Sequence, residues 1–181
     1  MLQTSTSYNL ALFALHFYLG AMIFAHGFYK VFRGGKLAGT ARWFDSIGMS
    51  PGWINARMAA ATELGSGALL VAGLLTPMAA GALVALMVVA IATVHRKNGF
   101  FVFNKGQGVE YCLGVIVTAI ALGTFGSGKF SIDYALRHQS FEHWLSRPMH
   151  ALVTTVVLGF GGSALQLAAV YRPSRATTTT P

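Results

Sequence analysis

The stretch that decides the fold is 10-LALFALHFYLGAMIFAHGFYKVFR-33, an apolar run that contains His16 and His26 and carries Lys30 near its end. A helix of this length crosses the hydrocarbon core of a bilayer, which is about 30 Å thick. Ionisable side chains are costly at that depth and are usually retained for a function. His26 and Lys30 lie one turn apart on one face, so we predict an imidazole just inside the membrane and an ammonium group at its rim.

The composition of the whole chain indicates a membrane protein. The 181 residues are 54% hydrophobic and only 10% charged, and the mean hydropathy is +0.57, values that ordinary water-soluble domains do not reach. The net charge of +8 comes from Lys and Arg residues that lie almost wholly between the apolar runs. Such bases indicate membrane topology and not a nucleic-acid partner. A single cysteine, Cys112, excludes an intrachain disulfide within this sequence.

Four further apolar runs predict helices, at residues 54–75, 78–95, 109–125 and 149–170. Pro77 is suited to begin the third run, which forms a hairpin with the second. The basic loop after the first run has room for a short surface helix, and Ser131 can cap an amphipathic surface segment before the last run. We therefore predict an all-α membrane protein with a four-helix transmembrane bundle and a fifth, C-terminal transmembrane helix.

The same patterns set the expected boundaries along the chain. They are an N-terminal extension at 1–9, the four-helix transmembrane domain at 10–134, an amphipathic interfacial segment at 135–148, an additional transmembrane helix at 149–171 and a disordered, Thr-rich tail at 172–181. In the additional helix, Gly159, Gly161 and Gly162 make a small-residue surface on which another helix can pack closely.

The distribution of Lys and Arg predicts the orientation in the membrane. With five spans, ten of the 13 bases fall on one side and only Lys129, Arg137 and Arg147 on the other. The positive-inside rule places the first side in the cytoplasm, with the N-terminus outside and the C-terminus inside. The polar residues near the cytoplasmic face are then His26, Lys30, His95, Asn98, Glu110 and Tyr111.

Glu63 is the acidic residue that falls deepest in an apolar run, near the middle of the bilayer. A carboxylate there must be neutral, paired with a cation or placed in a wet cavity. Arg57 is six residues earlier and faces another direction, so we expect a partner from another helix. His16 lies about 15 Å from His26 along its helix, and we expect it to form an interhelical hydrogen bond.

A short internal repeat relates His26 to His95 and Glu63-Leu64-Gly65 to the segment that begins at Glu110. Such a repeat favours two parallel hairpins, each of which contributes one His and one Glu to a shared axis.

These motifs together resemble the DoxX family of small bacterial membrane proteins. The resemblance extends over roughly residues 10–134 and is carried by His26-Gly27-Phe28-Tyr29-Lys30, Glu63-Leu64-Gly65, Leu74-Leu75-Thr76, His95 with Asn98-Gly99-Phe100-Phe101, Glu110-Tyr111 and Gly128-Lys129-Phe130-Ser131-Ile132-Asp133. It implies a multi-pass, four-helix unit of the bacterial cytoplasmic (inner) membrane. It also implies a link to the membrane subunit of a thiosulfate:quinone oxidoreductase, to quinone or catechol resistance, or to complexes of thiol-oxidative stress. The sequence after Tyr134 departs from the family pattern.

We predict one polar site in this bundle. The residues expected to be catalytic are His26, Glu63 and His95, those expected to bind substrate are Lys30, Asn98, Glu110 and Tyr111, and no metal ligands are expected. Imidazole and carboxyl groups can transfer protons, while Lys supplies charge to hold an oxidised compound. The alternative interpretation is structural: His26 caps helix carbonyls, Lys30 extends to the interface, and the other polar residues mark ordinary helix ends.

No flavin, nicotinamide or iron–sulfur motif is evident in the sequence, so redox chemistry would require a bound quinone or a partner protein. Two His and two Glu also make a conceivable metal or haem set, but Glu-x-x-His and His-x-x-x-His spacings are missing. His138, Glu142 and His143 miss the His-x-x-Glu-His spacing by one residue, and we interpret them as a solvated helix face.

The function that we predict is a membrane subunit of a quinone-linked or thiol/sulfur-redox oxidoreductase system for oxidative stress or quinone detoxification. Its expected partners are membrane lipids, a quinone or small redox compound, and either a second copy of the chain or a soluble or membrane redox protein. Two alternatives stay open: a non-catalytic membrane anchor or assembly partner of a redox complex, and a small-molecule exporter.

Overall fold

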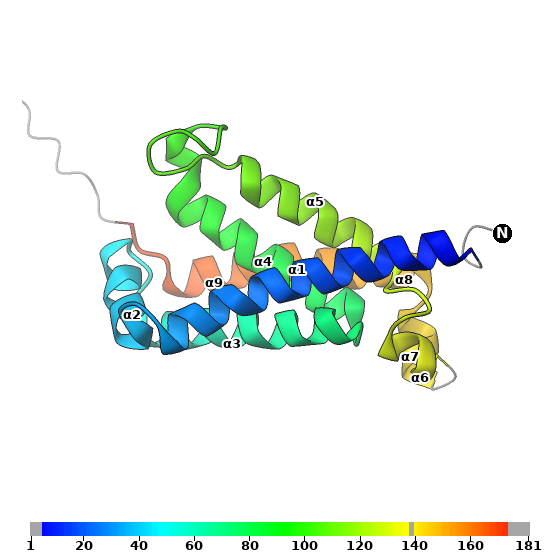
Figure 1. The fold of residues 1–181 in the computed structure, drawn as a ribbon. Coiled ribbons are helices and arrows are strands. Elements are labelled where there is room, and N and C mark those ends of the chain that lie inside the picture. The colour runs from blue at the N-terminus through cyan, green and yellow to red at the C-terminus, as the bar shows by residue number, and fades with distance from the viewer. Residues whose placement is uncertain (1–4, 138–139, 174–181) are drawn as a thin grey trace, which may run out of the picture.

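The computed structural model describes residues 5–137 and 140–173, and this part of the chain is helical without β-strands (Figure 1). The α-helices are α1 (Thr6–Phe32), α2 (Lys36–Ser46), α3 (Gly52–Ala72), α4 (Thr76–Ala90), α5 (Glu110–Phe125), α6 (Ile132–Leu136), α7 (Ser140–Leu145), α8 (Pro148–Val156) and α9 (Gly162–Val170). Short π-helical segments, η2 (Ile91–His95) and η4 (Val157–Gly161), extend α4 and join α8 to α9, and a 3₁₀ turn, η3 (Arg96–Asn98), follows η2.

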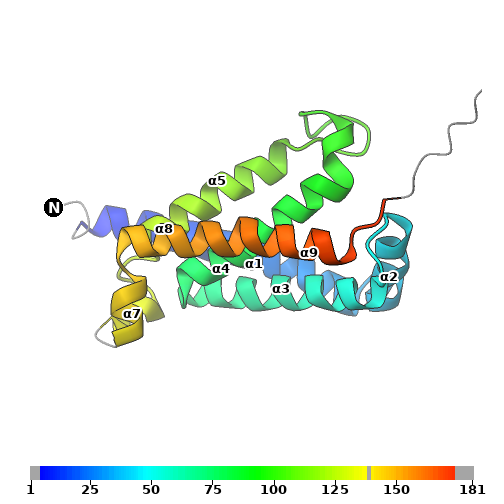
Figure 2. The ribbon, with the colours of Figure 1, turned by 180° about the vertical axis from the view of Figure 1, so that it is seen from behind.

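Three helical stretches in the described residues are long and apolar enough to cross a membrane, namely Thr6–Phe32, Thr76–Asn98 and Pro148–Val170. The predicted all-α membrane fold is thus confirmed. α3 has 21 residues and packs beside α1. α5 has 16 residues, fewer than the roughly 20 that a helix needs for a full crossing. α8, η4 and α9 form one long rod that packs against α4 (Figure 2).

Glycines bring α1 and α3 into close backbone contact. A Cβ atom on Gly67 would lie 2.7 Å from the backbone nitrogen of Phe24, and one on Gly20 would lie 2.6 Å from the backbone nitrogen of Val71. Helices in a membrane associate through such close packing because lipid is as apolar as their side chains. The two glycines therefore determine the register in which α3 passes α1.

The bundle has a basic end and an opposite end. The end that carries α2, the α4–α5 loop and the end of α9 is called the basic end (Figure 1). The end that carries α6, α7 and the start of α1 is called the opposite end. The backbone bridge between Met49 and Tyr171 fixes α9 to the α2 side. Lys and Arg side chains divide between the ends as the predicted topology requires, and the orientation in a membrane stays a prediction. Arg175, one of the bases in that count, lies outside the described residues.

At the opposite end, Asp133 ties its loop to the start of α4. One carboxylate oxygen accepts a hydrogen bond from the Leu75 backbone N–H at 2.6 Å, and the other accepts from the Thr76 N–H at 3.0 Å and the Thr76 hydroxyl at 2.6 Å. A carboxylate at a helix N-terminus satisfies free N–H groups and complements the helix dipole. Pro77 lies in this first turn, as the sequence predicts.

Two boundaries differ from the sequence analysis. α1 begins at Thr6, inside the 1–9 segment, because the Ser5 side chain accepts a hydrogen bond from the Tyr8 backbone N–H at 3.1 Å and caps the helix. The amphipathic surface segment contains two short helices, α6 and α7. Ser131 caps the first of them as predicted. Residues 1–4, the 138–139 segment that contains His138, and 174–181 of the tail lie outside the described residues.

Candidate functional site

A cavity of about 500 Å³ lies at the basic end, between α1, α3, α4 and α5 and beneath α2. The hairpin of α4 and α5 diverges from α1 toward this end, which separates the helices there (Figure 1). Five of the seven predicted site residues line the cavity: His26, Lys30, Glu63, His95 and Tyr111. They come from four helical segments that are far apart in the sequence, so the fold brings most of the predicted site together.

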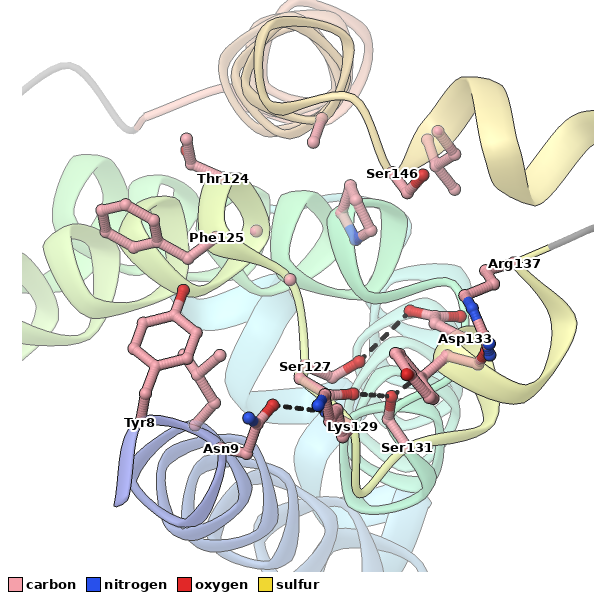
Figure 3. Close-up of a pocket in the computed structure, with 18 residues that line it drawn as sticks. Tyr8, Asn9, Thr124, Phe125, Ser127, Lys129, Ser131, Asp133, Arg137 and Ser146 are labelled. Atoms are coloured by element: carbon pink, nitrogen blue, oxygen red, sulfur yellow. Dashed lines mark hydrogen bonds between the residues drawn. The ribbon is translucent and has the colours of Figure 1, made fainter. Parts of the chain in front are cut away.

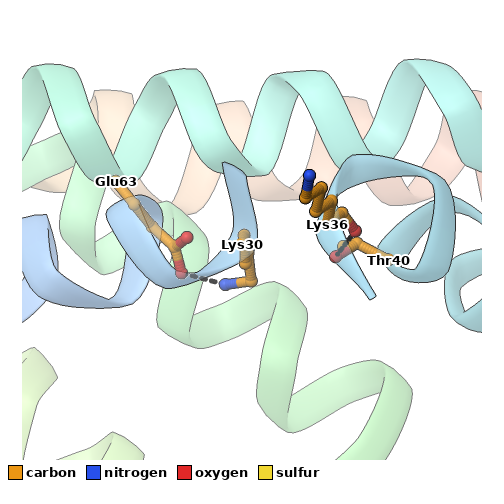
Figure 4. A network of polar contacts seen from close by, with 4 residues as sticks. All are labelled: Lys30, Lys36, Thr40 and Glu63. Carbon is orange, nitrogen blue, oxygen red and sulfur yellow. Dashed lines mark hydrogen bonds and ion pairs between the residues drawn. The ribbon is translucent and has the colours of Figure 1, made fainter. Parts of the chain in front are cut away.

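Lys30 and Glu63 form an ion pair in the wall of this cavity (Figure 4). The Glu63 side chain is 4% exposed and the Lys30 side chain 27% exposed. Gly27 permits the pair, since a Cβ atom at this position would lie 2.9 Å from the Cβ atom of Glu63. The partner from another helix that a buried Glu63 requires is therefore Lys30, one turn beyond His26.

The second carboxylate oxygen of Glu63, Oε2, is buried and has no hydrogen-bond partner among the residues that the structure describes. Buried polar atoms are nearly always hydrogen-bonded, and each exception needs an explanation. A carboxylate oxygen beside a cavity that lacks a protein donor is positioned to accept a hydrogen bond or a proton from a bound molecule.

His95 ends the π-helical segment η2 and faces the same cavity. Its Nδ1 atom lies 2.9 Å from the backbone oxygen of Gln107. Because a carbonyl oxygen only accepts, Nδ1 carries a hydrogen, and in the neutral ring Nε2 is left as an acceptor. Single π-helical turns recur at functional sites because they re-aim side chains near a helix end.

Asn98 and Glu110, predicted to bind substrate, do not line the cavity. The Asn98 side-chain amide donates to the backbone oxygens of Gly106 at 2.7 Å and of Gln107 at 3.1 Å, and Glu110 Oε2 accepts from the Val102 backbone N–H at 2.9 Å. These bonds hold the α4–α5 loop, whose Gln107 carbonyl in turn holds His95. In this structure the two residues therefore hold the loop that orients His95 and do not contact the cavity themselves.

Tyr111 and His26 complete the polar lining. The Tyr111 hydroxyl donates to the Met22 sulfur at 3.1 Å, across the cavity from α5 to α1. His26 is exposed at the cavity wall, one turn from Lys30. Cys112 also lines the cavity and is 2% exposed.

Sequence reasoning missed the part that α2 plays. Trp43 and Phe44 of α2 line the cavity, whereas the sequence indicates only that this loop has room for a short surface helix. The chain turns sharply after α1 through Gly34 and Lys36, which both have positive φ angles, +52° and +53°. Gly34 favours this left-handed conformation, but no local pattern reveals that the following helix folds back over the bundle.

Other ionisable residues of the spans lie away from the site. His16 is fully buried, and its Nδ1–H donates to the Leu70 backbone oxygen at 2.7 Å, which is the interhelical bond that the sequence predicts. The Arg57 guanidinium lies 5.0 Å from the centre of the Trp53 ring, and Glu63 pairs with Lys30 instead. Across residues 5–137 and 140–173, no three His, Cys, Asp or Glu side chains converge closely enough to hold a metal ion.

The fold and the cavity define an all-helical membrane protein with a polar site inside its helical bundle. A comparison with protein families gives a match to DoxX over residues 11–96, a little under half of the chain, and this confirms the predicted resemblance to DoxX over that part. The matched part contains α1 to α4, with His26, Lys30, Glu63 and His95. No curated protein and no solved structure matches the chain.

Proposed function

We propose that this protein is the membrane subunit of a redox system and that its cavity binds a quinone and the corresponding quinol, with Glu63 and His95 exchanging protons with the bound ring. The observation that carries the proposal is Glu63 Oε2, a buried carboxylate oxygen without a protein partner in the described part of the chain, in the wall of a cavity of about 500 Å³. DoxX proteins are often linked to redox and oxidative-stress systems, and this supports the same class of function.

The charges around the cavity favour a neutral ligand over an anionic sulfur compound. The ion pair with Glu63 neutralises Lys30, so the buried part of the site carries no net positive charge. An anion entering beside the Glu63 carboxylate would meet repulsion in a region of low dielectric constant. A hydroxyl group would instead find two acceptors, Glu63 Oε2 and His95 Nε2.

The side chains divide the work of proton exchange. Glu63 takes up one hydroxyl proton at Oε2, and His95 takes up a second at Nε2, while Lys30 holds the Glu63 carboxylate in place. Gln107 keeps the His95 ring oriented through Nδ1. A bound quinone supplies the two-electron chemistry that these side chains lack, and the electrons leave to or arrive from a partner redox protein.

Trp43 allows a direct test, because it lines the cavity, whereas Trp53 and Trp144 do not. Quinones quench indole fluorescence at short range. In a Trp53→Phe/Trp144→Phe background we expect a short-chain benzoquinone to quench Trp43 saturably, and we expect Glu63→Leu to weaken the saturable binding. The matched control is Arg57→Gln, a change on α3 at an exposed residue that does not line the cavity. Linear quenching without saturation would reject the cavity as the quinone site.

A membrane anchor for a redox partner remains the second candidate, favoured by the α4–α5 loop. Phe100, Phe101 and Phe103 are 52%, 50% and 79% exposed, and the rings of Phe101 and Phe103 stack with centres 5.0 Å apart. Exposed aromatic clusters of this kind mark contact surfaces. Under the anchor function, Phe103→Ser abolishes the phenotype and Glu63→Gln does not; under the quinone function the opposite holds.

The proposed orientation puts the basic end in the cytoplasm, with the N-terminus outside, the C-terminus inside and the protein in the bacterial inner membrane. The uneven distribution of bases between the two ends supports it. Reporter fusions after Lys36 and after Arg175 are both expected to give a cytoplasmic signal. A periplasmic signal at Arg175 would mean that the stretch from α8 to α9 does not cross.

A further inference from the structure

A second concave surface lies on another face of α1 from the polar cavity. It has a volume of about 810 Å³ and is lined by six residues of α1 from Phe17 onward, by Arg33 just after the end of α1, and by Ala68 and Val71 of α3. We call it the α1 groove. None of its residues lines the polar cavity, so the two sites lie back to back on α1.

The shape of the α1 groove follows from alternating small and aromatic side chains. Ala21 and Ala25 leave the helix surface low, while Phe17, Phe24 and Phe28 rise beside them and are 46%, 39% and 44% exposed. From Phe17 to Arg33 the helix rises about 24 Å, more than the roughly 15 Å of one leaflet of the hydrocarbon core. The groove is long and apolar enough to hold an extended hydrocarbon chain.

The groove ends in a positive charge at the basic end. Arg33 is exposed, and within the described ranges no carboxylate forms an ion pair with it. The acids with described side chains are engaged elsewhere: Glu63 with Lys30, and the remaining three, Asp45, Glu110 and Asp133, with backbone N–H groups. Guanidinium groups bind phosphate through two parallel hydrogen bonds. Tyr29, which is 61% exposed, lines the same groove as Arg33.

We propose that the α1 groove is a binding site for an anionic phospholipid, whose acyl chain lies along Phe17, Phe24 and Phe28 and whose phosphate contacts Arg33. This inference is independent of the quinone function. A second copy of the chain fits less well, because a two-fold contact through this face of α1 would place the Arg33 side chains of both copies in one interface, where their positive charges repel. A phospholipid supplies the complementary charge and the complementary chain together.

Native mass spectrometry of the purified protein tests the site. The protein is mixed with phosphatidylglycerol or with phosphatidylcholine of the same acyl chains, and the retained lipid is counted. We expect preferential retention of phosphatidylglycerol. Arg33→Gln should reduce that preference about fivefold, the factor that corresponds to about 1 kcal/mol for one basic side chain at an anionic surface. The matched control is Arg96→Gln, which removes an exposed base at the same end but outside the groove.

Variants that fill the groove test the contact with the lipid acyl chain separately from the contact with the headgroup. Ala25 is exposed, so Ala25→Phe should fold, and it should lower the retention of both lipids. Ala21→Leu is a second variant with the same expectation. Equal retention of the two lipids by the unmodified protein, or an unchanged preference in Arg33→Gln, would overturn the proposal. It would also be overturned by a dimer that Ala25→Phe dissociates while lipid retention stays unchanged.

Discussion

The buried carboxylate Glu63 at the basic end and the carboxylate Asp133 at the opposite end can be compared directly. Asp133 receives hydrogen bonds on both oxygens, from two backbone N–H groups and a hydroxyl at the start of α4. The Ser127 hydroxyl also donates a hydrogen bond to Asp133, at 3.5 Å (Figure 3). Glu63 receives an ion pair on one oxygen, and within the described residues its other oxygen has no partner. A carboxylate whose acceptor sites are filled by its own fold holds that fold together. A carboxylate that faces a cavity with one oxygen unpaired can still accept a hydrogen bond from a ligand.

The surroundings of the two acids explain the difference. Asp133 meets free N–H groups at a helix N-terminus, where every such group needs an acceptor. Glu63 lies within α3, where the backbone N–H groups are already bonded inside the helix, so only side chains or ligands can reach it. Lys30 from α1 satisfies one oxygen and leaves the other for a ligand.

The largest effect on stability is expected when Lys30 is removed. Lys30→Met leaves the Glu63 carboxylate buried without a cation, and breaking a buried pair in this way costs about 3 to 5 kcal/mol. We expect a strong drop in membrane abundance and in the unfolding temperature in detergent. Lys36→Met is the control, because Lys36 is exposed and its side chain forms no ion pair within the described ranges.

A double variant tests the origin of that loss. Lys30→Met/Glu63→Gln removes both charges, so it should recover most of the abundance that Lys30→Met loses. A Lys30→Met protein as stable as the unmodified one would mean that the ion pair does not form in the folded state.

Removing Asp133 is expected to have the next largest effect. Asp133→Ala deletes the acceptor for two backbone N–H groups and the Thr76 hydroxyl, and at about 1 kcal/mol for each bond the loss is about 3 kcal/mol. Quenching of Trp43 by a quinone should be unchanged in the protein that folds, because the Asp133 cluster and the cavity lie at opposite ends. Loss of saturable quenching in folded Asp133→Ala protein would contradict this separation of structural and binding roles.

Much of the fold could be predicted from the sequence, because apolar runs long enough to span a bilayer have few alternatives to helices. The need of Glu63 for a partner on another helix also follows from its position. The identity of that partner does not, because it depends on how α3 slides along α1. Close contacts at Gly20 and Gly67, which only the assembled pair of helices reveals, determine that register and bring Lys30 opposite Glu63.

The roles of Asn98 and Glu110 show where sequence reasoning about the site stops. A polar residue at a helix end has the same appearance in the sequence whether it binds a ligand or holds a loop. Here three carbonyl acceptors lie within reach of the Asn98 amide, and the Val102 N–H lies within reach of Glu110. Contacts of this kind depend on the path of the α4–α5 loop, which no local pattern defines.

Asn98 therefore offers a smaller, indirect test of the basic end. Asn98→Ala removes the bonds that hold Gly106 and Gln107, with a loss of about 1 kcal/mol because the loop is partly exposed. Once Gln107 is released, the His95 ring loses its orientation, so quinone affinity in the Trp43 assay should fall although Asn98 does not touch the cavity. Lys97→Ala, a change of the preceding exposed residue, is the control and should alter neither property. Unaltered affinity in Asn98→Ala would mean that Gln107 does not orient His95.

The smallest effect on stability, and the sharpest on function, is expected for Glu63→Gln. Glutamine preserves the size of the side chain, and its amide oxygen can still accept a hydrogen bond from Lys30, so the loss of stability should stay below about 1 kcal/mol. It cannot take up a proton in exchange with a bound ligand, so resistance to an added quinone or a diamide-type oxidant should be abolished at normal membrane abundance. Asp133→Asn is the matched change at the other end: it replaces one acceptor oxygen with an NH₂ donor facing N–H groups, and should lower abundance while the protein that remains keeps its activity. If Glu63→Gln is abundant and fully protective, the acid serves only as a hydrogen-bonding group, and the anchor function becomes the better account of the basic end.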